Sequence, residues 1–182
     1  MYNDLEKAIY FATKAHKGQK RRNDDIDVIY HPYSVAMMLK DINLDNEYVI
    51  TGLLHDIIED SEYTYDDIKE TFSETIADNI LRVSEDNIIK DWIERKKEFI
   101  SRLEQEQDIN ILYLECADKL HNLLSDYELF NKVGKRAWDS SPASYEENKW
   151  YYGEILKIIN KKCSKNSLTI RYERLYNYYF GD

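Results

Sequence analysis

The sequence predicts an all-α protein. Of its 182 residues, 43% are hydrophobic and 33% are charged, whereas only five are glycine and two are proline. This composition suits a folded, mainly helical chain and argues against disorder and against a β-sandwich. Apolar residues also recur at helical spacing along most of the chain. Because this length is that of one domain with its own core, we expect a single compact helical domain.

The first predicted helix runs from Asp4 to about Lys17, and Gly18 is its expected stop. His16 falls in the last turn, where a positive charge favours the helix dipole, so we expect a structural role and do not count it as a metal ligand. The helix is followed by a basic run, residues 17–22, and a loop. In an acidic protein such a run is either a solvated surface or an anion-binding patch.

Proline shapes the start of the second predicted helix. It disfavours helical conformation in the residue before it, so we expect residues 26–31 to be extended near their end. Pro32 suits the first turn of a helix that continues through Leu39, because its missing N–H is no loss there. His31 is thereby expected at a helix entrance.

Residues 53–60, Leu-Leu-His-Asp-Ile-Ile-Glu-Asp, form the stretch around which the chain is organised. In a helix, His55 and Glu59 lie one turn apart, Asp56 and Asp60 likewise, and the two rows are neighbours. Like charges at this spacing oppose the helix unless something positive is present. A divalent cation bound to these side chains would offset their negative charge. The alternative is a solvated acidic helix end with one hydrogen-bonded histidine.

Capping residues mark the remaining helices. We expect the helix that carries the His55-Asp56 motif to be capped by Asp45 and to run through Ile57 without a break. Thr64, spaced from Asp67 as in a capping box, should start a helix running through Leu81. Residues 86–91 are a predicted connection.

The second half of the chain begins with a predicted helix at Trp92, which carries Lys96 and Lys97 in a basic turn; a salt-bridged, solvated face is the alternative. Further helices are expected over residues 109–124, capped by Asp108, and from Tyr145, capped by Ser144. Residues 131–143 are a predicted loop, and residues 163–182 contain two short tyrosine-rich patterned stretches.

An aspartate inside the apolar helix over residues 109–124 needs a polar or charged partner. Asn122 lies one turn beyond Asp118, so both side chains should point at the same feature. Together with His31, His55 and Asp56, Asp118 makes a mixed nitrogen and oxygen donor set that suits Mn²⁺, Fe²⁺, Zn²⁺ or another first-row divalent ion.

The overall charge limits the partners. A net charge of −10 disfavours non-specific binding to nucleic acid or to anionic membranes, so an anionic substrate would need local cations. Cys116 and Cys163 have no metal-type spacing, and we expect two reduced thiols. No signal peptide pattern and no run of about 18 apolar residues is present, so we expect a soluble, cytoplasmic protein.

Three motifs resemble those of a known family. Residues 30–32 (Tyr-His-Pro), 53–60 and 117–122 (Ala-Asp-Lys-Leu-His-Asn) are similar to the signature of HD-domain metal-dependent phosphohydrolases. The Glu-Asp pair after His-Asp marks the alarmone-hydrolase branch, which contains RelA/SpoT hydrolase domains, small alarmone hydrolases and the metazoan SpoT homologue. The resemblance covers roughly residues 4–160 and includes the spacing from His16 through Gln19 to Arg21.

The resemblance implies a single HD-domain fold over residues 1–162, with residues 163–182 as an extension packed on the same domain. It implies one bound Mn²⁺, water activation by Glu59 and Asp60, and a nucleotide substrate. The implied metal ligands are His31, His55, Asp56 and Asp118, and the implied substrate-binding residues are Arg21, Arg22, Lys96, Lys97 and Asn122. The chain departs from the family at Leu124, where an arginine is frequent.

The predicted reaction is therefore hydrolysis of the 3′-diphosphate of guanosine tetra- and pentaphosphate. The first alternative is an HD phosphohydrolase of another phosphorylated nucleotide such as NADPH. The second is a regulatory module that senses a nucleotide, and intact Glu59 and Asp60 argue against it because a non-catalytic domain has no need for their charge. The sequence does not report the oligomeric state.

Overall fold

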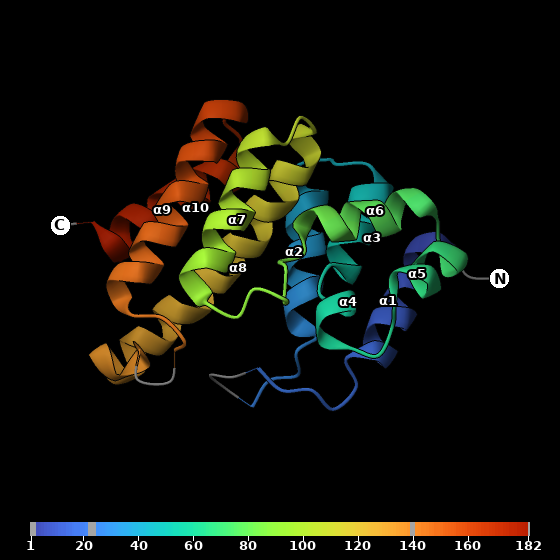
Figure 1. Cartoon of the computed structure of the whole chain (residues 1–182), viewed down its shortest axis with the longest axis horizontal. Helices are drawn as coiled ribbons and strands as arrows, with labels where there is room; N and C mark the ends of the chain where they lie inside the picture. Colours follow the sequence, from blue (N-terminus) through green and yellow to red (C-terminus); the bar gives the residue numbers. More distant parts are fainter. Residues whose placement is uncertain (1–2, 22–24, 139–140, 182) are drawn as a thin grey trace. The chain divides into compact units, whose positions relative to one another are not determined.

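The computed structural model describes residues 3–21, 25–138 and 141–181 (Figure 1). Every regular element among these residues is an α- or 3₁₀-helix, and the pairing of Lys20 with Asp27 is an isolated β-bridge. The predicted all-α class is confirmed. The chain divides into two compact units, Met1–Ser84 and Glu85–Asp182. The expected boundary at residue 162 remains a prediction.

The first unit is built around α3. Its helices are α1 (Asp4–Ala15), α2 (Tyr30–Asp41), α3 (Asn46–Leu54), α4 (Ile57–Asp60), α5 (Tyr65–Thr71) and α6 (Glu74–Val83). Helix α3 packs against α1, α2 and α6, and α5 packs against α6 (Figure 1). Every residue of α3 from Val49 to Leu54 is buried, as a helix surrounded by others requires.

Gly52 lets α3 lie close to α2. A Cβ at this position would stand 2.8 Å from Leu39 Cδ1 and 3.4 Å from Val35 Cγ1, both on α2. The missing side chain therefore sets the spacing between the two helices. Because His31 lies in the first turn of α2 and His55 follows α3, this spacing also determines how close the two histidines lie.

The prediction of one unbroken helix from Asp45 through Ile57 is wrong. Helix α3 ends at Leu54, His55 and Asp56 form a turn, and α4 starts at Ile57. His55 Nδ1 lies 2.7 Å from the Gly52 carbonyl oxygen, which a continuous helix would pair with the Asp56 amide. The imidazole thus competes with the backbone for that carbonyl. Asp45 precedes the helix as predicted, but its side chain makes no capping bond.

Two further boundaries differ from the prediction. The helix expected from Thr64 through Leu81 is split between α5 and α6, because Ser73 caps a new helix by accepting a hydrogen bond from the Ile76 amide at 3.1 Å. Helix α2 already starts at Tyr30, so His31 is helical rather than extended. Pro32 is tolerated there since amides of the first turn have no intrahelical acceptor.

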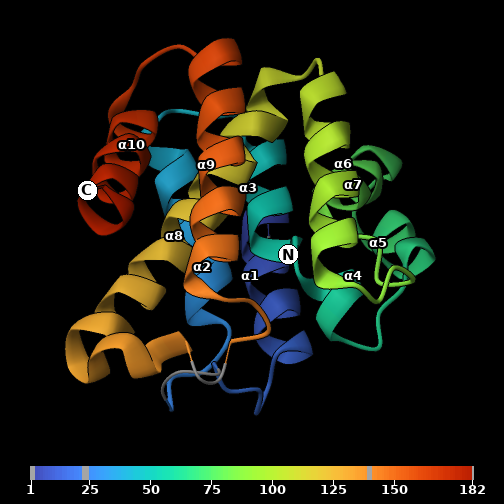
Figure 2. The same cartoon turned by 60° about the vertical axis from the view of Figure 1, so that its left-hand side comes forward.

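The second unit contains α7 (Trp92–Gln105), α8 (Ile109–Val133), η1 (Gly134–Trp138), α9 (Tyr145–Lys162) and α10 (Ser167–Phe180). Helix α9 packs against α7, α8 and α10, and α10 also packs against α8 (Figure 2). Asp108, Ser144 and Asp91 cap α8, α9 and α7 through their side chains.

The end of the chain differs from the prediction as well. Helix α8 continues through Val133, and a 3₁₀-helix, Gly134–Trp138, occupies part of the expected loop. The two tyrosine-rich stretches are one helix, α10, whose Tyr172 and Tyr179 are buried; Tyr172 donates a hydrogen bond to the Tyr152 carbonyl at 2.9 Å. Among the described residues, no helix is long and apolar enough to cross a membrane.

Candidate functional site

Three of the predicted metal ligands converge in the first unit. His31 comes from the first turn of α2, and His55 and Asp56 form the turn between α3 and α4. The Nε2 atoms of the two histidines lie 3.2 Å apart. The Asp56 carboxylate oxygens lie 3.5 Å from His31 Nε2 and 3.1 Å from His55 Nε2. Both imidazoles are buried.

This donor set fits a first-row divalent ion. His55 Nδ1 faces a carbonyl oxygen, which accepts only, so Nδ1 carries the proton and Nε2 presents a lone pair. Donors about 2.1 Å from an ion and at right angles to each other stand about 3 Å apart, close to the spacing seen here. Two buried nitrogens and a carboxylate at this distance need a cation or a proton between them.

The predicted acidic pair lies in α4, the short helix that follows Asp56. Glu59 and Asp60 end α4, and the Asp60 amide donates to the Asp56 carbonyl at 2.8 Å, so these two aspartates lie one turn apart as predicted. Burial raises the pKa of the Asp60 carboxyl, and the Asp56 charge adds to this, whereas His16, His55 and His31 oppose it. Asp60 thus belongs to the same electrostatic cluster as the donors.

His16 is linked to the acidic pair through Gln19, a contact that the sequence prediction did not include. Its side chain is buried, and Nδ1 lies 2.8 Å from Gln19 Oε1. Gln19 Nε2 in turn donates to the Asp60 carbonyl at 2.6 Å. Gly18, at φ +81°, makes the turn that returns Gln19 towards His16. A sequence signal for this contact was available: Gln19 follows His16 by three residues, and Gly18 between them allows a tight turn.

The basic run after α1 is described only in part. The Arg21 amide donates to the Ile26 carbonyl at 2.9 Å, which holds this residue at the base of the loop. Lys20 forms an ion pair with Asp27 at 2.8 Å, so its positive charge already has a partner within the loop. Arg22 lies outside the described residues. The substrate contacts assigned to Arg21 and Arg22 therefore stay predictions.

In the second unit, Asp118 is the centre of a buried polar cluster on α8. Its carboxylate oxygens accept hydrogen bonds from Lys119 Nζ at 2.6 Å and Asn122 Nδ2 at 2.7 Å. Burial disfavours the Lys119 cation, but Asp118 and Glu115 outweigh this and raise the pKa of Lys119. Asp118 and Asn122 therefore bond to each other, and the expectation that both point at one further feature stays a prediction.

The predicted basic turn on α7 is mostly paired internally. Lys96 and Arg95 both bind the Glu85 carboxylate, Arg95 through Nε at 3.0 Å. Lys96 Nζ also lies over the Tyr151 ring, 4.5 Å from its centroid. Lys97 pairs with Glu94 at 2.9 Å on the exposed side of the helix. Glu85 lies in a connection with no periodic pattern, so the sequence offered no signal for its role.

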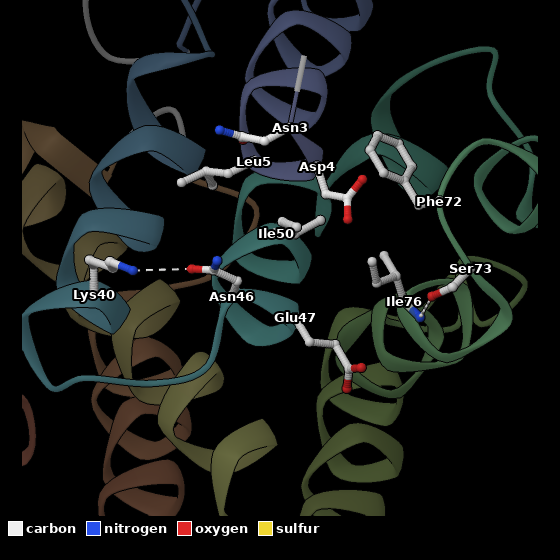
Figure 3. A pocket seen from close by; sticks show the side chains of 10 residues that line it. All are labelled: Asn3, Asp4, Leu5, Lys40, Asn46, Glu47, Ile50, Phe72, Ser73 and Ile76. Atoms are coloured by element: carbon white, nitrogen blue, oxygen red, sulfur yellow. Dashed lines mark hydrogen bonds between the residues drawn. The ribbon is translucent and has the colours of Figure 1, made fainter. Parts of the chain in front are cut away.

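A separate pocket of about 540 Å³ in the first unit contains none of the predicted site residues (Figure 3). It is bounded by the first turns of α1, α3 and α6 and by Lys40, which donates to Asn46 Oδ1 at 3.1 Å. Ile50, Phe72 and Ile76 form its apolar side. The pocket is therefore not the site that the donor residues define.

The fold and the donor set define an all-α protein with a buried histidine pair and an adjoining aspartate that could hold a divalent metal. Residues 8–136 match the HD domain family. The chain belongs to this family.

Several relatives and solved structures are similar to the chain. It is 33% identical over 121 residues to guanosine-3′,5′-bis(diphosphate) 3′-pyrophosphohydrolase of Aquifex aeolicus, covering 66% of this chain and 17% of the relative. It is 34% identical over 123 residues to the bifunctional (p)ppGpp synthase/hydrolase SpoT of Escherichia coli, covering 65% and 17%. The chain thus spans about a sixth of the length of the curated relatives it matches.

Among solved structures, the Listeria monocytogenes protein lmo0812 is 31% identical, with a TM-score of 0.76 over 84% of this chain and 99% of that one. A metazoan ortholog of SpoT, described as hydrolysing ppGpp, is 18% identical, with a TM-score of 0.78 over 100% of this chain and 99% of that one. This second likeness concerns the fold alone.

Proposed function

We propose that the protein is a metal-dependent hydrolase that removes the 3′-diphosphate of guanosine tetra- and pentaphosphate, (p)ppGpp, and releases pyrophosphate. The observation that carries the proposal is that His31, His55 and Asp56 lie close together. Glu59 and Asp60 stand at the end of α4, the short helix that directly follows Asp56. Relatives named for this activity, about a third identical over two thirds of this chain, support the choice of substrate.

We assign the metal to His31, His55, Asp56 and Asp118, and we propose Mn²⁺ or another first-row divalent ion. The role of Asp118 rests on the family resemblance. Its hydrogen bonds to Lys119 and Asn122 would orient the carboxylate, as partners of metal ligands commonly do. When bound, a divalent ion would lower the pKa of water and offset phosphate charge.

We assign the proton transfers to Glu59 and Asp60. In the proposed reaction, water adds to the phosphorus attached to the ribose 3′ oxygen, and the bond between those two atoms breaks. One carboxylate takes the proton from the water, and the 3′ oxygen must receive a proton as it leaves. The raised pKa of Asp60 favours its use as the proton carrier.

We assign substrate binding to Arg21, Arg22, Lys96, Lys97 and Asn122. An arginine offers a flat cation for stacking on the purine, and lysines offer charge for phosphate. Since Lys96 is paired with Glu85, it contributes to phosphate binding only if it exchanges that carboxylate for the substrate. Lys97, more exposed, can bind phosphate at a smaller cost.

The test is product release from ppGpp, pppGpp and NADPH with added Mn²⁺. We expect GDP or GTP with pyrophosphate, loss of activity with a chelator, and loss in Asp56→Ala. Asp41→Ala, an exposed aspartate at the end of α2, is the matched control and should behave like the wild type.

Orthophosphate release from NADPH alone would assign the protein to another nucleotide. Bound Mn²⁺ without hydrolysis of any of these nucleotides would favour a regulatory module. Either result would overturn the proposal.

A further inference from the structure

The end of α4 is tied to the end of α1 by two consecutive hydrogen bonds. Gln19 Nε2 donates to the Asp60 carbonyl at 2.6 Å, and Gln19 Oε1 lies 2.8 Å from His16 Nδ1. All three residues belong to the first unit. The two bonds therefore connect the C-terminal end of one helix with the last residue of another through a single amide side chain.

The chemistry of the groups fixes the direction of both bonds. A carbonyl oxygen accepts only, so the Gln19 atom facing Asp60 is the NH₂ group and the atom facing His16 is the oxygen. His16 must then donate from Nδ1. In the neutral imidazole this leaves a lone pair on Nε2, an atom that is buried and has no hydrogen-bond partner among the described residues. The His16 tautomer is thus set by the Asp60 backbone.

Helix α4 needs an external tether. It contains only four residues, and the last carbonyls of a helix have no intrahelical donor. Directly after Asp60, Ser61 is extended, with φ −137° and ψ −177°, so the chain leaves the helix at once. Without the Gln19 amide, the Asp60 backbone would lose a bond that fixes its position relative to α1.

We propose that His16 and Gln19 are positioning residues that hold the end of α4, and with it the Asp60 carboxylate, in the geometry required for proton transfer. This inference rests on the function proposed above. His16 orients the Gln19 amide, and the amide fixes the Asp60 carbonyl. Because small displacements of a catalytic group reduce turnover strongly, loss of this relay should lower kcat while leaving the metal donors in place.

Two variants of Gln19 test the relay. Gln19→Leu removes both hydrogen bonds, and Gln19→Glu keeps an acceptor for His16 but has no donor for the Asp60 carbonyl. In both we expect kcat for ppGpp to fall by about tenfold or more, with KM and bound Mn²⁺ close to wild type. Hydrogen–deuterium exchange at the α4 amides should become faster in both variants.

Two variants of His16 separate positioning from general stability. The amide nitrogen of asparagine stands where Nδ1 of histidine stands, so His16→Asn keeps the donor to Gln19 and should retain most of kcat and the slow exchange of α4. His16→Leu has no donor and should behave like Gln19→Leu. A purely structural role would instead lower the melting temperature of both His16 variants without this difference in kcat.

Ser61→Ala is the matched control, because the Ser61 hydroxyl also bonds to an α4 carbonyl, that of Ile57 at 2.7 Å, but makes no hydrogen bond to Asp60 among the described residues. It should leave kcat unchanged. Wild-type kcat and wild-type exchange in Gln19→Leu would overturn the relay. If the wild type released no pyrophosphate from ppGpp, the proposed function would fail instead; the exchange measurement, which needs no substrate, would still test the tether.

Discussion

Replacing Gly52 by alanine should destabilise the protein and weaken its metal site. The new Cβ would lie 2.8 Å from Leu39 Cδ1 and 3.4 Å from Val35 Cγ1. Leu39 is itself fully buried, and because protein interiors are close-packed its methyl group has little room to move. Helix α3 must therefore shift away from α2 by roughly 1 Å to restore an ordinary carbon–carbon contact of about 3.5–4.0 Å.

Two opposing effects set the magnitude. Alanine in place of glycine favours a helix by about 0.8–1.0 kcal/mol. Forcing an extra methyl group into a packed core costs about 1–3 kcal/mol. We expect the packing cost to prevail and the free energy of unfolding to fall by about 1 kcal/mol, which lowers the melting temperature by roughly 2–4 °C in a chain of this size. The same shift should move His55 away from His31.

Urea unfolding and Mn²⁺ titration of wild type, Gly52→Ala, Leu39→Val and the double variant would measure both effects. Shortening Leu39 should relieve the contact, so the double variant should lose about 1 kcal/mol less than the sum of the two single changes. The Mn²⁺ dissociation constant should rise severalfold in Gly52→Ala and recover partly in the double variant. Stability raised by about 1 kcal/mol, together with additive changes, would show that helix propensity decides and that Gly52 does not set the helix spacing.

Further predictions concern single groups. His55→Ala should lose bound metal and activity together, and full metal occupancy by elemental analysis would contradict its assignment as a ligand. Glu59→Gln with Asp60→Asn should keep the metal but lose turnover by about two orders of magnitude or more; steady-state rates near wild type would refute a proton-transfer role. Arg21→Lys should raise KM for a guanine nucleotide by the equivalent of about 1 kcal/mol at nearly constant kcat, and an unchanged KM would make Arg21 part of a solvated loop. Burial raises the pKa of the Cys163 thiol to about 11, so iodoacetamide should react at pH 8 on the order of 200-fold more slowly than with an exposed thiol and about tenfold faster per pH unit up to about pH 10; an ordinary rate in the folded protein would contradict this.

Local patterns in the sequence determined most of the helices. Side-chain caps at Thr64, Asp108 and Ser144 were predicted from residue type and spacing, and the structure contains all three. These signals are readable because a capping bond joins residues only two or three positions apart. The all-α class and the family motifs were likewise readable, since each depends on composition or on short contiguous segments.

Only the tertiary structure decided where the helices break and which polar groups meet. The turn at His55 arises because an imidazole takes the Gly52 carbonyl, and the tether from Gln19 to Asp60 joins residues 41 positions apart. The family resemblance and local charge assign Lys96 to substrate binding, which stays a prediction, whereas its pairing with Glu85, in an unpatterned connection, could not be read from the sequence. Such contacts depend on how the chain folds back on itself, and periodicity describes only one helix at a time.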